Sequence, residues 1–495
     1  MLEIAANENA QVALALAWAS WADEEENDRQ KAIVRARKYF DGEQYAYLSA
    51  RLREILDLSG APDPNQLLHL NVSDKVVYAL TDRMHVDSFT SSDESLGTLA
   101  GEWWAANRLD AKESSIYENT LRDGESFVFV DLDSSGLPRF NPHPRFCDTT
   151  NDGSGFGCKA FYPNDDETQP MLYVAKRWAE TMIGKNGMTT ARQRMTLYYP
   201  DHFERYVLDR GKWTPVRDNV QIIDAGGVLG FIPESVDARG FVPWVDGTGA
   251  PLGIPIIHFC NRGRKCEIDS TVVSMQNVIN HALVDLVESN DTHGFPIWKF
   301  FGFYPTSDGR DLKSDGSNRL KLKPNTIIGT TKSRTEVDAL REPPIDPAPL
   351  VSVVDKAIAW IAQAKDIPAA RFQLNAQIPA EGTQKQLEAP MLARIGAIQT
   401  MFGNSWEDCF AMARRLINVF GAGGLDENET LETQWQPLTT RADDRENPVP
   451  FWTAAAQAVA AGLPLETYLA RNGWSDEDIG AIYESMPNEQ LVMPT

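Results

Sequence analysis

The most regular pattern of apolar positions lies in residues 267–291. Successive apolar side chains there are 4, 3, 4, 3 and 4 residues apart, which is a heptad seam held for nearly three repeats. The seam consists of Ile268, Val272, Met275, Ile279, Ala282 and Leu286. A second apolar strip, formed by Val273, Val284 and Val287, predicts a helix that is covered on more than one side. Such a helix, on the order of 35 Å long, can be buried in one large core or can stand beside identical helices in a ring of subunits.

A second helix follows the first and is separated from it by a strand-rich insert. Residues 296–344 contain strand-like runs at 296–304, 320–322 and 326–330 around a Ser/Asp/Gly loop at 305–318. The second helix is predicted over 346–365, because Asp346 is a suitable N-cap and Pro347 a suitable first helical residue.

A third and longer helix is predicted over 384–420, after a loop punctuated by Pro and Gly at 366–383. Pro390 either kinks this helix or marks its start, because proline lacks the N–H of the helical hydrogen bond. The order along this part of the chain is therefore helix, strand-rich insert, helix, loop and long helix.

The N-terminal half is predicted to change from helix to strand near residue 125. Helices are expected at 32–40, 47–58, 71–84 and 94–109, and strands at 126–131, 195–199, 202–208 and 254–259. Small helices are expected near the C-terminus, at 451–461 and 465–472. These patterns predict an α+β fold, mainly helical, in a chain whose 495 residues are too many for one compact core.

The charge balance excludes a protein that grips nucleic acid over a wide surface. The formal net charge is −23, whereas broad phosphate binding needs an excess of Lys and Arg.

The cysteines and the apolar runs bear on the compartment of the protein. Five scattered cysteines are typical of a reducing compartment. The apolar run 10–22 has no basic residue before it and acidic residues after it, which indicates a buried or amphipathic helix and not a signal peptide. No apolar stretch reaches the roughly 18 residues that span a membrane.

Motifs for catalysis or metal binding are not recognisable in the sequence. Two local groups have ligand types that zinc accepts, namely His258 with Cys260 and Cys266, and His143 with Cys147 and Cys158. Each group is one ligand short, so we interpret them as ordinary partly buried residues and expect no metal and no cofactor. An enzyme is the weaker hypothesis. It would be a hydrolase or a nuclease using Asp148 with Asp152, or Asp165 with Asp166 and Glu167, since metal-dependent nucleases use such carboxylates.

The strand-rich insert contains a basic cluster. Between residues 308 and 334 there are seven Lys or Arg and three Asp, so the segment carries +4 in an acidic chain. The basic residues are Arg310, Lys313, Arg319, Lys321, Lys323, Lys332 and Arg334. They are either a solvated edge of a small sheet, where lysines discourage edge pairing, or a docking surface for an acidic partner or DNA phosphates.

Several segments, taken in order, resemble the portal proteins of tailed double-stranded DNA bacteriophages, specifically the long-tailed type of actinobacterial and other Gram-positive hosts. The resembling segments are 37–44 (RKYFDGEQ) with Tyr47-Leu48, 71–87 (NVSDKVVYALTDRMHVD), 121–130 (LRDGESFVFV), 254–262 (IPIIHFCNR) and 402–408 (FGNSWED). Each is short, and their number and order over residues 30–420 make the resemblance specific.

The resemblance implies a subunit of a closed ring, usually of about twelve copies, at one vertex of the capsid. The implied regions are a wing (1–255), a first stem helix (256–295), a clip (296–344), a second stem helix (345–366), a tunnel loop (367–383), a long wing/stem helix (384–424) and a crown (425–495). The channel would pass double-stranded DNA without sequence specificity during packaging and ejection. The acidic balance suits this role, because a negative wall lets DNA slide.

The resemblance also implies roles for particular residues. The tunnel loop would project Gln373, Asn375, Gln377, Glu381 and Lys385 toward DNA. The clip patch (Arg310, Lys313, Arg319, Lys321 and Lys323) would dock partners, and the heptad seam would pack the stems of the ring. The implied partners are further copies of the chain, the terminase large subunit, the head-tail adaptor, and the major capsid and scaffolding proteins.

The resemblance places the protein in the virion, at the capsid portal vertex, with assembly in the host cytoplasm and no membrane contact. The alternative hypothesis is a capsid- or tail-completion structural protein without a channel. Such a protein would not need the helix–insert–helix order of residues 267–365.

Overall fold

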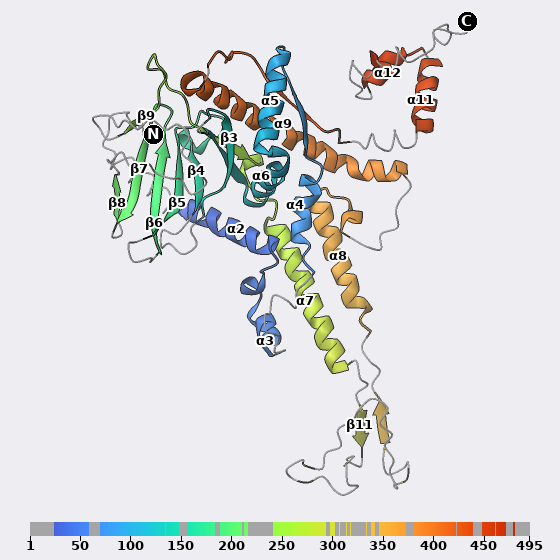
Figure 1. The fold of residues 1–495 in the computed structure, drawn as a ribbon. Coiled ribbons are helices and arrows are strands. Elements are labelled where there is room, and N and C mark those ends of the chain that lie inside the picture. The colour runs from blue at the N-terminus through green and yellow to red at the C-terminus, as the bar shows by residue number, and fades with distance from the viewer. Residues whose placement is uncertain are drawn as a thin grey trace. The chain divides into compact units, whose positions relative to one another are not determined.

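The computed structural model of the chain forms two compact units, residues 1–435 and 436–495 (Figure 1). It describes residues 24–58, 70–133, 135–147, 156–183, 189–209, 212–215, 241–293, 298–301, 306, 313, 317, 333, 338–341, 346–372, 381–421, 423–438, 448–460, 462–471 and 479–480. The predicted boundary at 424/425 therefore falls eleven residues before the division between the units, because residues 425–435 belong with the first unit.

The N-terminal helices agree with the sequence prediction except in two places. They are α2 (Glu24–Phe40), η1 (Tyr45–Tyr47), α3 (Ala50–Leu58), α4 (Ser73–Thr81), α5 (Glu94–Asn107) and α6 (Leu109–Asp123). Helix α2 starts earlier than predicted. The pattern also missed α6, because the break before it is a left-handed residue, Arg108 (φ 53°), and arginine gives no breaker signal.

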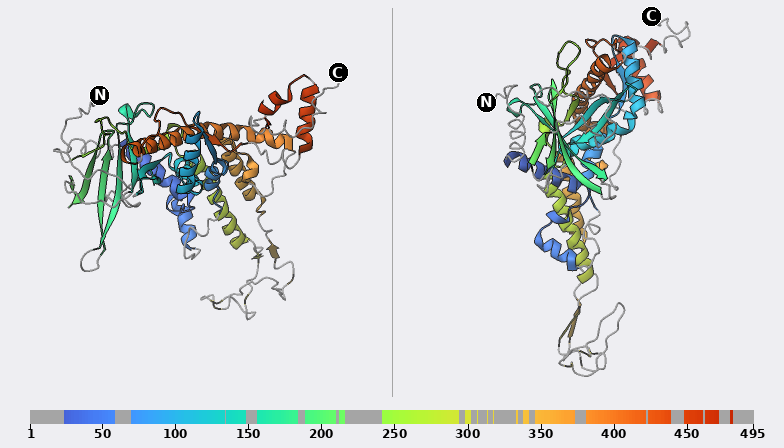
Figure 2. Two further views of the ribbon diagram at one scale, coloured as in Figure 1. Left: turned by 45° about the horizontal axis from the view of Figure 1, so that its top comes forward. Right: turned by 60° about the vertical axis from the view of Figure 1, so that its left-hand side comes forward.

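A three-stranded antiparallel sheet, in the order β10-β2-β3, forms the centre of the first unit. Its strands are β2 (Glu125–Leu132), β3 (Pro138–Pro144) and β10 (Ile256–Cys260). All eight residues of β2 are buried, because this strand is central and both α6 and the long helix α9 (Glu381–Phe420) pack on the sheet (Figure 2). The largest buried side chain is Trp406 of α9, whose Nε1 donates to the Tyr117 hydroxyl at 2.8 Å.

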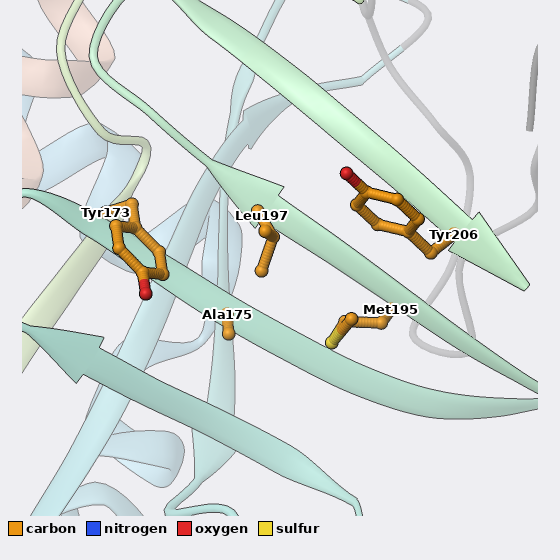
Figure 3. Packing of buried hydrophobic residues seen from close by; sticks show 5 residues of the cluster. All are labelled: Tyr173, Ala175, Met195, Leu197 and Tyr206. Carbon is orange, nitrogen blue, oxygen red and sulfur yellow. The ribbon is translucent and has the colours of Figure 1, made fainter. Parts of the chain in front are cut away.

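A six-stranded antiparallel sheet follows in the chain, in the order β4-β5-β6-β7-β8 with β9 beside β7. The strands are β4 (Gly157–Phe161), β5 (Tyr173–Ile183), β6 (Thr189–Tyr198), β7 (His202–Asp209), β8 (Lys212–Pro215) and β9 (Val242–Pro243). Figure 3 shows the apolar cluster on one face, where Tyr173, Ala175, Met195, Leu197 and Tyr206 are buried together. Asp209 of β7 pairs with Lys212 of β8.

Two strands that the sequence pattern missed pair with each other across the first unit. They are β1 (Val86–Thr90) and β13 (Glu432–Trp435). Both are short and half exposed, so neither shows the apolar alternation that identifies a strand.

Helices α7 (Ser270–His293) and α8 (Ala348–Ala364) pack side by side (Figure 1). The chain between them contains β11 (Trp298–Phe301) and β12 (Asp338–Arg341), which pair antiparallel. The strand predicted at the start of this insert is thus confirmed in β11, whereas the strands predicted near 320–330 lie outside the described residues.

The long helix α9 begins three residues before its predicted start and contains Pro390 within it, so the proline does not mark its first residue. The second unit contains α11 (Pro448–Ala460) and α12 (Leu465–Arg471), close to the predicted small helices. The fold is α+β, as predicted. None of the helices in the described part of the chain combines the length and hydropathy that a membrane crossing requires.

Candidate functional site

The α7–α8 pair and its junction with α9 form the region to which the sequence assigned most of the candidate residues. Helix α7 has a side-chain cap, because Asp269 accepts from the Thr271 and Val272 N–H groups at 3.0 and 3.1 Å. The cap predicted for α8 differs: Pro347 and not Asp346 is the N-cap residue, and the helix begins at Ala348. Asp346 still accepts from the Ala348 N–H at 3.0 Å.

The heptad seam of α7 is covered by the chain itself. Ile268, Val272, Ile279 and Ala282 are 5% exposed or less, and Met275 and Leu286 are partly buried. Helix α7 packs against α8 and against α3 and α4. The structure thus realises the first alternative for this helix, burial in one core. A neighbouring subunit would have to contact other side chains than the buried members of the seam.

A polar stripe on α7, which the sequence analysis missed, fixes the helix to the N-terminal elements. Gln276 and Asn280 are fully buried and hydrogen-bonded to each other at 3.0 Å. The Gln276 carbonyl oxygen accepts from the Val72 N–H at 3.0 Å, and the Asn280 amide donates to Gln44 at 2.7 Å. The signal in the sequence is two amides four residues apart within an apolar helix.

An ionic cluster joins α7, α8 and α9 at one point. Glu267, 4% exposed, pairs with Arg394 of α9 and lies 3.7 Å from the Lys365 Nζ at the end of α8. Lys365 also binds Asp269 at 2.8 Å, and Arg394 donates to the Lys365 carbonyl at 3.0 Å. Burial, the largest single influence, would raise the pKa of Asp269, but the hydrogen bond and charge of Lys365 together with the Val272 and Thr271 N–H groups lower it. The cluster ties three segments that are distant in sequence.

The candidate tunnel-loop residues lie at and beyond this junction. Gln373, Asn375 and Gln377 are outside the described residues, whereas Glu381 and Lys385 belong to the first turns of α9. At the start of the predicted loop, where the structure describes the chain up to residue 372, the side chains of Ile367 and Phe372 are buried, with exposed fractions of 3% and 7%. The loop between α8 and α9 is therefore shorter than predicted at its C-terminal side.

Of the five candidate clip residues, one lies in the part of the chain that the structure describes. Lys313 is exposed, while Arg310, Arg319, Lys321 and Lys323 lie outside the described residues. Their arrangement as a patch thus stays a prediction.

A second ionic cluster ties α2 to the central sheet. Arg145, 1% exposed, binds Glu26 at 2.7 Å and also pairs with Glu125. Lys159 lies 3.2 Å from Glu26, and burial lowers the pKa of Lys159 to about 8. Burial, the largest single influence, would raise the pKa values of both carboxyls. Arg145 lowers both, together with Lys159 and Gln30 at Glu26 and with His258 and Arg264 at Glu125, so both pKa values lie below their ordinary value.

His258, one of the residues considered as zinc ligands, has other partners. The Nδ1 atom of His258 is hydrogen-bonded to the Tyr162 hydroxyl at 2.7 Å, and its Nε2 atom to the Glu125 carboxylate at 2.8 Å. The His258 ring also stacks on Phe127. Burial raises the pKa of Cys266 to about 12, as expected for an inert thiol. Within the described ranges no group of three or more His, Cys, Asp or Glu could hold a metal ion.

The acidic residues of the nuclease hypothesis are likewise paired. Arg264 binds Asp165 at 2.8 Å and Glu167 at 3.2 Å, and Asp166 accepts from Thr168 at 2.7 Å. Asp148 and Asp152 lie outside the described residues. The carboxylates of Asp165 and Glu167 therefore form ion pairs with Arg264, and that of Asp166 accepts a hydrogen bond.

A comparison with protein families places almost the whole chain in one of them. Residues 20–485 match the family model described as "Phage portal protein, SPP1 Gp6-like". A search of curated proteins found no match to the chain. The match includes both helices of the α7–α8 pair, the insert between them, the ionic junction and α9.

Proposed function

The chain belongs to the SPP1 Gp6-like family of phage portal proteins, and on that premise we propose that it forms the ring-shaped channel through which double-stranded DNA enters and leaves the capsid. Proteins of this family are structural, form homo-oligomeric rings at the virion portal vertex and act in genome packaging with capsid and terminase. The observation on which the proposal depends is the family match over residues 20–485. The ring number, about twelve, and the role in ejection are part of the proposal.

We assign α7 and α8 to the stem of the channel and the insert between them to the clip. The antiparallel pair β11–β12 supports this assignment, because it brings the two ends of the insert together where the chain leaves α7 and approaches α8. The residues before 256 would form the wing, the long helix α9 would join wing and stem, and the C-terminal unit 436–495 would form the crown.

The segment that joins α8 to α9, predicted as 367–383, is proposed as the tunnel loop that approaches DNA. Its polar residues Gln373, Asn375 and Gln377 suit steric contact rather than grip, because amides do not replace the counterions of DNA. Deletion of Leu374 to Pro379 should leave ring formation intact and reduce DNA packaging or retention. Normal DNA packaging by the deletion variant would contradict the assignment of this segment as the tunnel loop.

The basic clip residues are proposed to dock an acidic face of the terminase large subunit or of the head-tail adaptor. Charge steering of this kind weakens as salt rises. Lys321→Glu combined with Lys323→Glu should therefore lower partner binding at low salt and have less effect at high salt. Unchanged binding at low salt would favour the solvated-edge interpretation.

The first experiment is the molar mass of the purified chain together with negative-stain electron microscopy. With 55.1 kDa per chain, a ring of about twelve copies has a mass of 12 × 55.1, about 661 kDa, and a central hole. Compact dimers or tetramers without a hole would overturn the channel, and ring-shaped particles of this mass would support it.

A further inference from the structure

His202, the first residue of β7, lies between two carboxylates and two aromatic rings. Its Nδ1 atom is 2.7 Å from the Asp201 carboxylate, and its Nε2 atom is 3.6 Å from the Glu204 carboxylate. The imidazole ring stacks on Tyr199 at a centroid distance of 4.5 Å and on Phe241 at 5.0 Å. All four neighbours favour a positively charged imidazole, because carboxylates attract a cation directly and aromatic faces attract it through their π electrons.

Glu204 depends on His202 for the compensation of its charge. Its side chain lies on the apolar face that Figure 3 shows, because it is two residues before Tyr206 on β7, and only 4% of Glu204 is exposed. The Tyr206 hydroxyl donates to Glu204 at 2.7 Å, and in the described part of the chain His202 is the ion-pair partner of this carboxylate. A buried carboxylate that loses its cation stays desolvated, which destabilises the structure around it.

The turn between β6 and β7 attaches the six-stranded sheet to the chain that leads to β10. The Asp201 carbonyl accepts from the Trp244 N–H at 2.8 Å, and the Pro200 carbonyl accepts from the Gly253 N–H at 3.0 Å. Trp244 in turn stacks on Phe420, the last residue of α9. The charged groups described above thus lie where the sheet is attached to residues 241–253 and, through Trp244, to the end of α9.

The two carboxylates determine the protonation of His202. Burial, the largest single influence, would lower the pKa of His202, but the hydrogen bonds and charges of Glu204 and Asp201 raise it above the ordinary value of 6.5. A group whose pKa is raised in the folded state stabilises the fold fully below its ordinary pKa. This stabilisation is lost as pH rises through the pKa of the folded state.

The other described groups around His202 do not titrate in the same range. Burial raises the pKa of Tyr173, Tyr199 and Tyr206 above the ordinary value of 10, so these hydroxyls stay neutral near pH 7. Phe241 and both residues of β9 carry no charge. Among the described groups at this point, the charge that changes near neutral pH is therefore that of His202.

We propose that His202 is a pH-sensitive clamp on the attachment of the six-stranded sheet to residues 241–253. While the imidazole is protonated, it compensates Asp201 and Glu204, and the attachment stays closed. When the imidazole loses its proton, two carboxylates face a neutral ring, and the attachment opens locally more often. This inference goes beyond the proposed function and does not depend on ring formation.

Hydrogen exchange of the full-length chain between about pH 6 and 8.5 tests the clamp, with each rate divided by the intrinsic exchange rate at that pH. In the wild type, the protection of the amides of residues 242–253 should fall by roughly threefold or more as pH rises. Protection in α8, which contains no histidine, should change little over the same range. Protection of residues 242–253 that does not fall with pH in the wild type would overturn the inference.

His202→Gln should abolish this pH dependence and leave protection low throughout, because glutamine carries no charge. The matched control is His281→Gln, since His281 is exposed on α7 and forms no ion pair with a described residue. The control should keep the wild-type fall in protection. A fall that His202→Gln preserves would also overturn the inference.

Glu204→Gln keeps the test decisive if His202→Gln does not fold. It removes the buried carboxylate that needs the cation, so the fall in protection with pH should become smaller than in the wild type. A fall of wild-type size in Glu204→Gln would overturn the clamp, whereas the proposed channel would be unaffected.

Discussion

The buried guanidinium of Arg145 is the residue-scale feature with the clearest energetic consequence. It is held by Glu26 from α2 and Glu125 from β2, and Lys159 adds a second cation beside Glu26. Removing one partner from a buried group of this kind typically costs about 3–5 kcal/mol, because the remaining charge stays desolvated. The N-terminal helix is therefore attached to the central sheet by charges as well as by apolar packing.

The lowered pKa values of Glu26 and Glu125 predict the acid behaviour of the protein. A carboxyl whose pKa in the folded state lies below its ordinary value of 4.5 stabilises the fold above pH 4.5, and this stabilisation is lost as pH falls through the folded pKa. Thermal unfolding at one protein concentration should therefore show a melting temperature that declines steeply below pH 4.5. Glu26→Gln should lower stability at pH 7 by about 3–5 kcal/mol and make the acid decline shallower.

Asp28→Asn is the control for this prediction, because Asp28 also lies on α2 but pairs with Lys31 at the surface, where both are about 70% exposed. Exposed pairs contribute little to stability. The melting profile of this variant should follow the wild type. An acid decline that is unchanged in Glu26→Gln would show that other carboxyls cause it.

At the scale of elements, the ionic junction connects helices α7 and α8 to α9. Glu267 precedes α7, Lys365 follows α8 and Arg394 lies about one turn after Pro390 in α9, so one carboxylate connects three helices. Asn261 also donates to Glu267, at 2.9 Å. Because the proposed tunnel loop starts directly after Lys365, the junction also fixes the origin of that loop.

Glu267→Gln should loosen this junction locally. Lys365 and Arg394 would lose the shared carboxylate, and the start of α7 and the end of α8 should exchange amide hydrogens faster. Amide hydrogens in strands β5 and β6, which belong to the six-stranded sheet and not to the junction, should exchange at the wild-type rate. Asp285→Asn is the matched control, since Asp285 lies on α7 and makes no ion pair with a described residue. Equal exchange in both variants would show that the junction does not hold the helices.

At the scale of the whole molecule, the sequence pattern predicted the elements with strong periodicity and missed those set by tertiary contacts. Helices α7, α8 and α9 were predicted within a few residues. The pattern did not show that the seam of α7 is buried within one chain, because burial by α8, α3 and α4 depends on contacts distant in sequence. Strand β13 was missed for the same reason, since its only described strand partner, β1, lies more than 300 residues earlier.

The division between the two units predicts different effects for two truncations. A chain ending at Trp435 keeps β13 and should retain the main thermal transition, because residues 436–495 form a separate unit. A chain ending at Leu425 removes β13, and it also removes the Asp426 and Glu429 carbonyls that accept from the Arg414 guanidinium at 2.9 and 2.8 Å. Arg414 is 3% exposed, so its donors would lose their partners in a poorly hydrated position.

The shorter chain should therefore melt at a lower temperature than the chain ending at Trp435, or fail to fold. Arg414→Leu in the full-length chain separates the two causes, because it removes the buried charge and keeps β13. If Arg414→Leu melts near the wild type while the shorter chain does not, the strand pair β1–β13 is the main contribution. Equal melting of both truncations would instead mean that residues 426–435 add nothing to the first unit, which would contradict its boundary at Trp435.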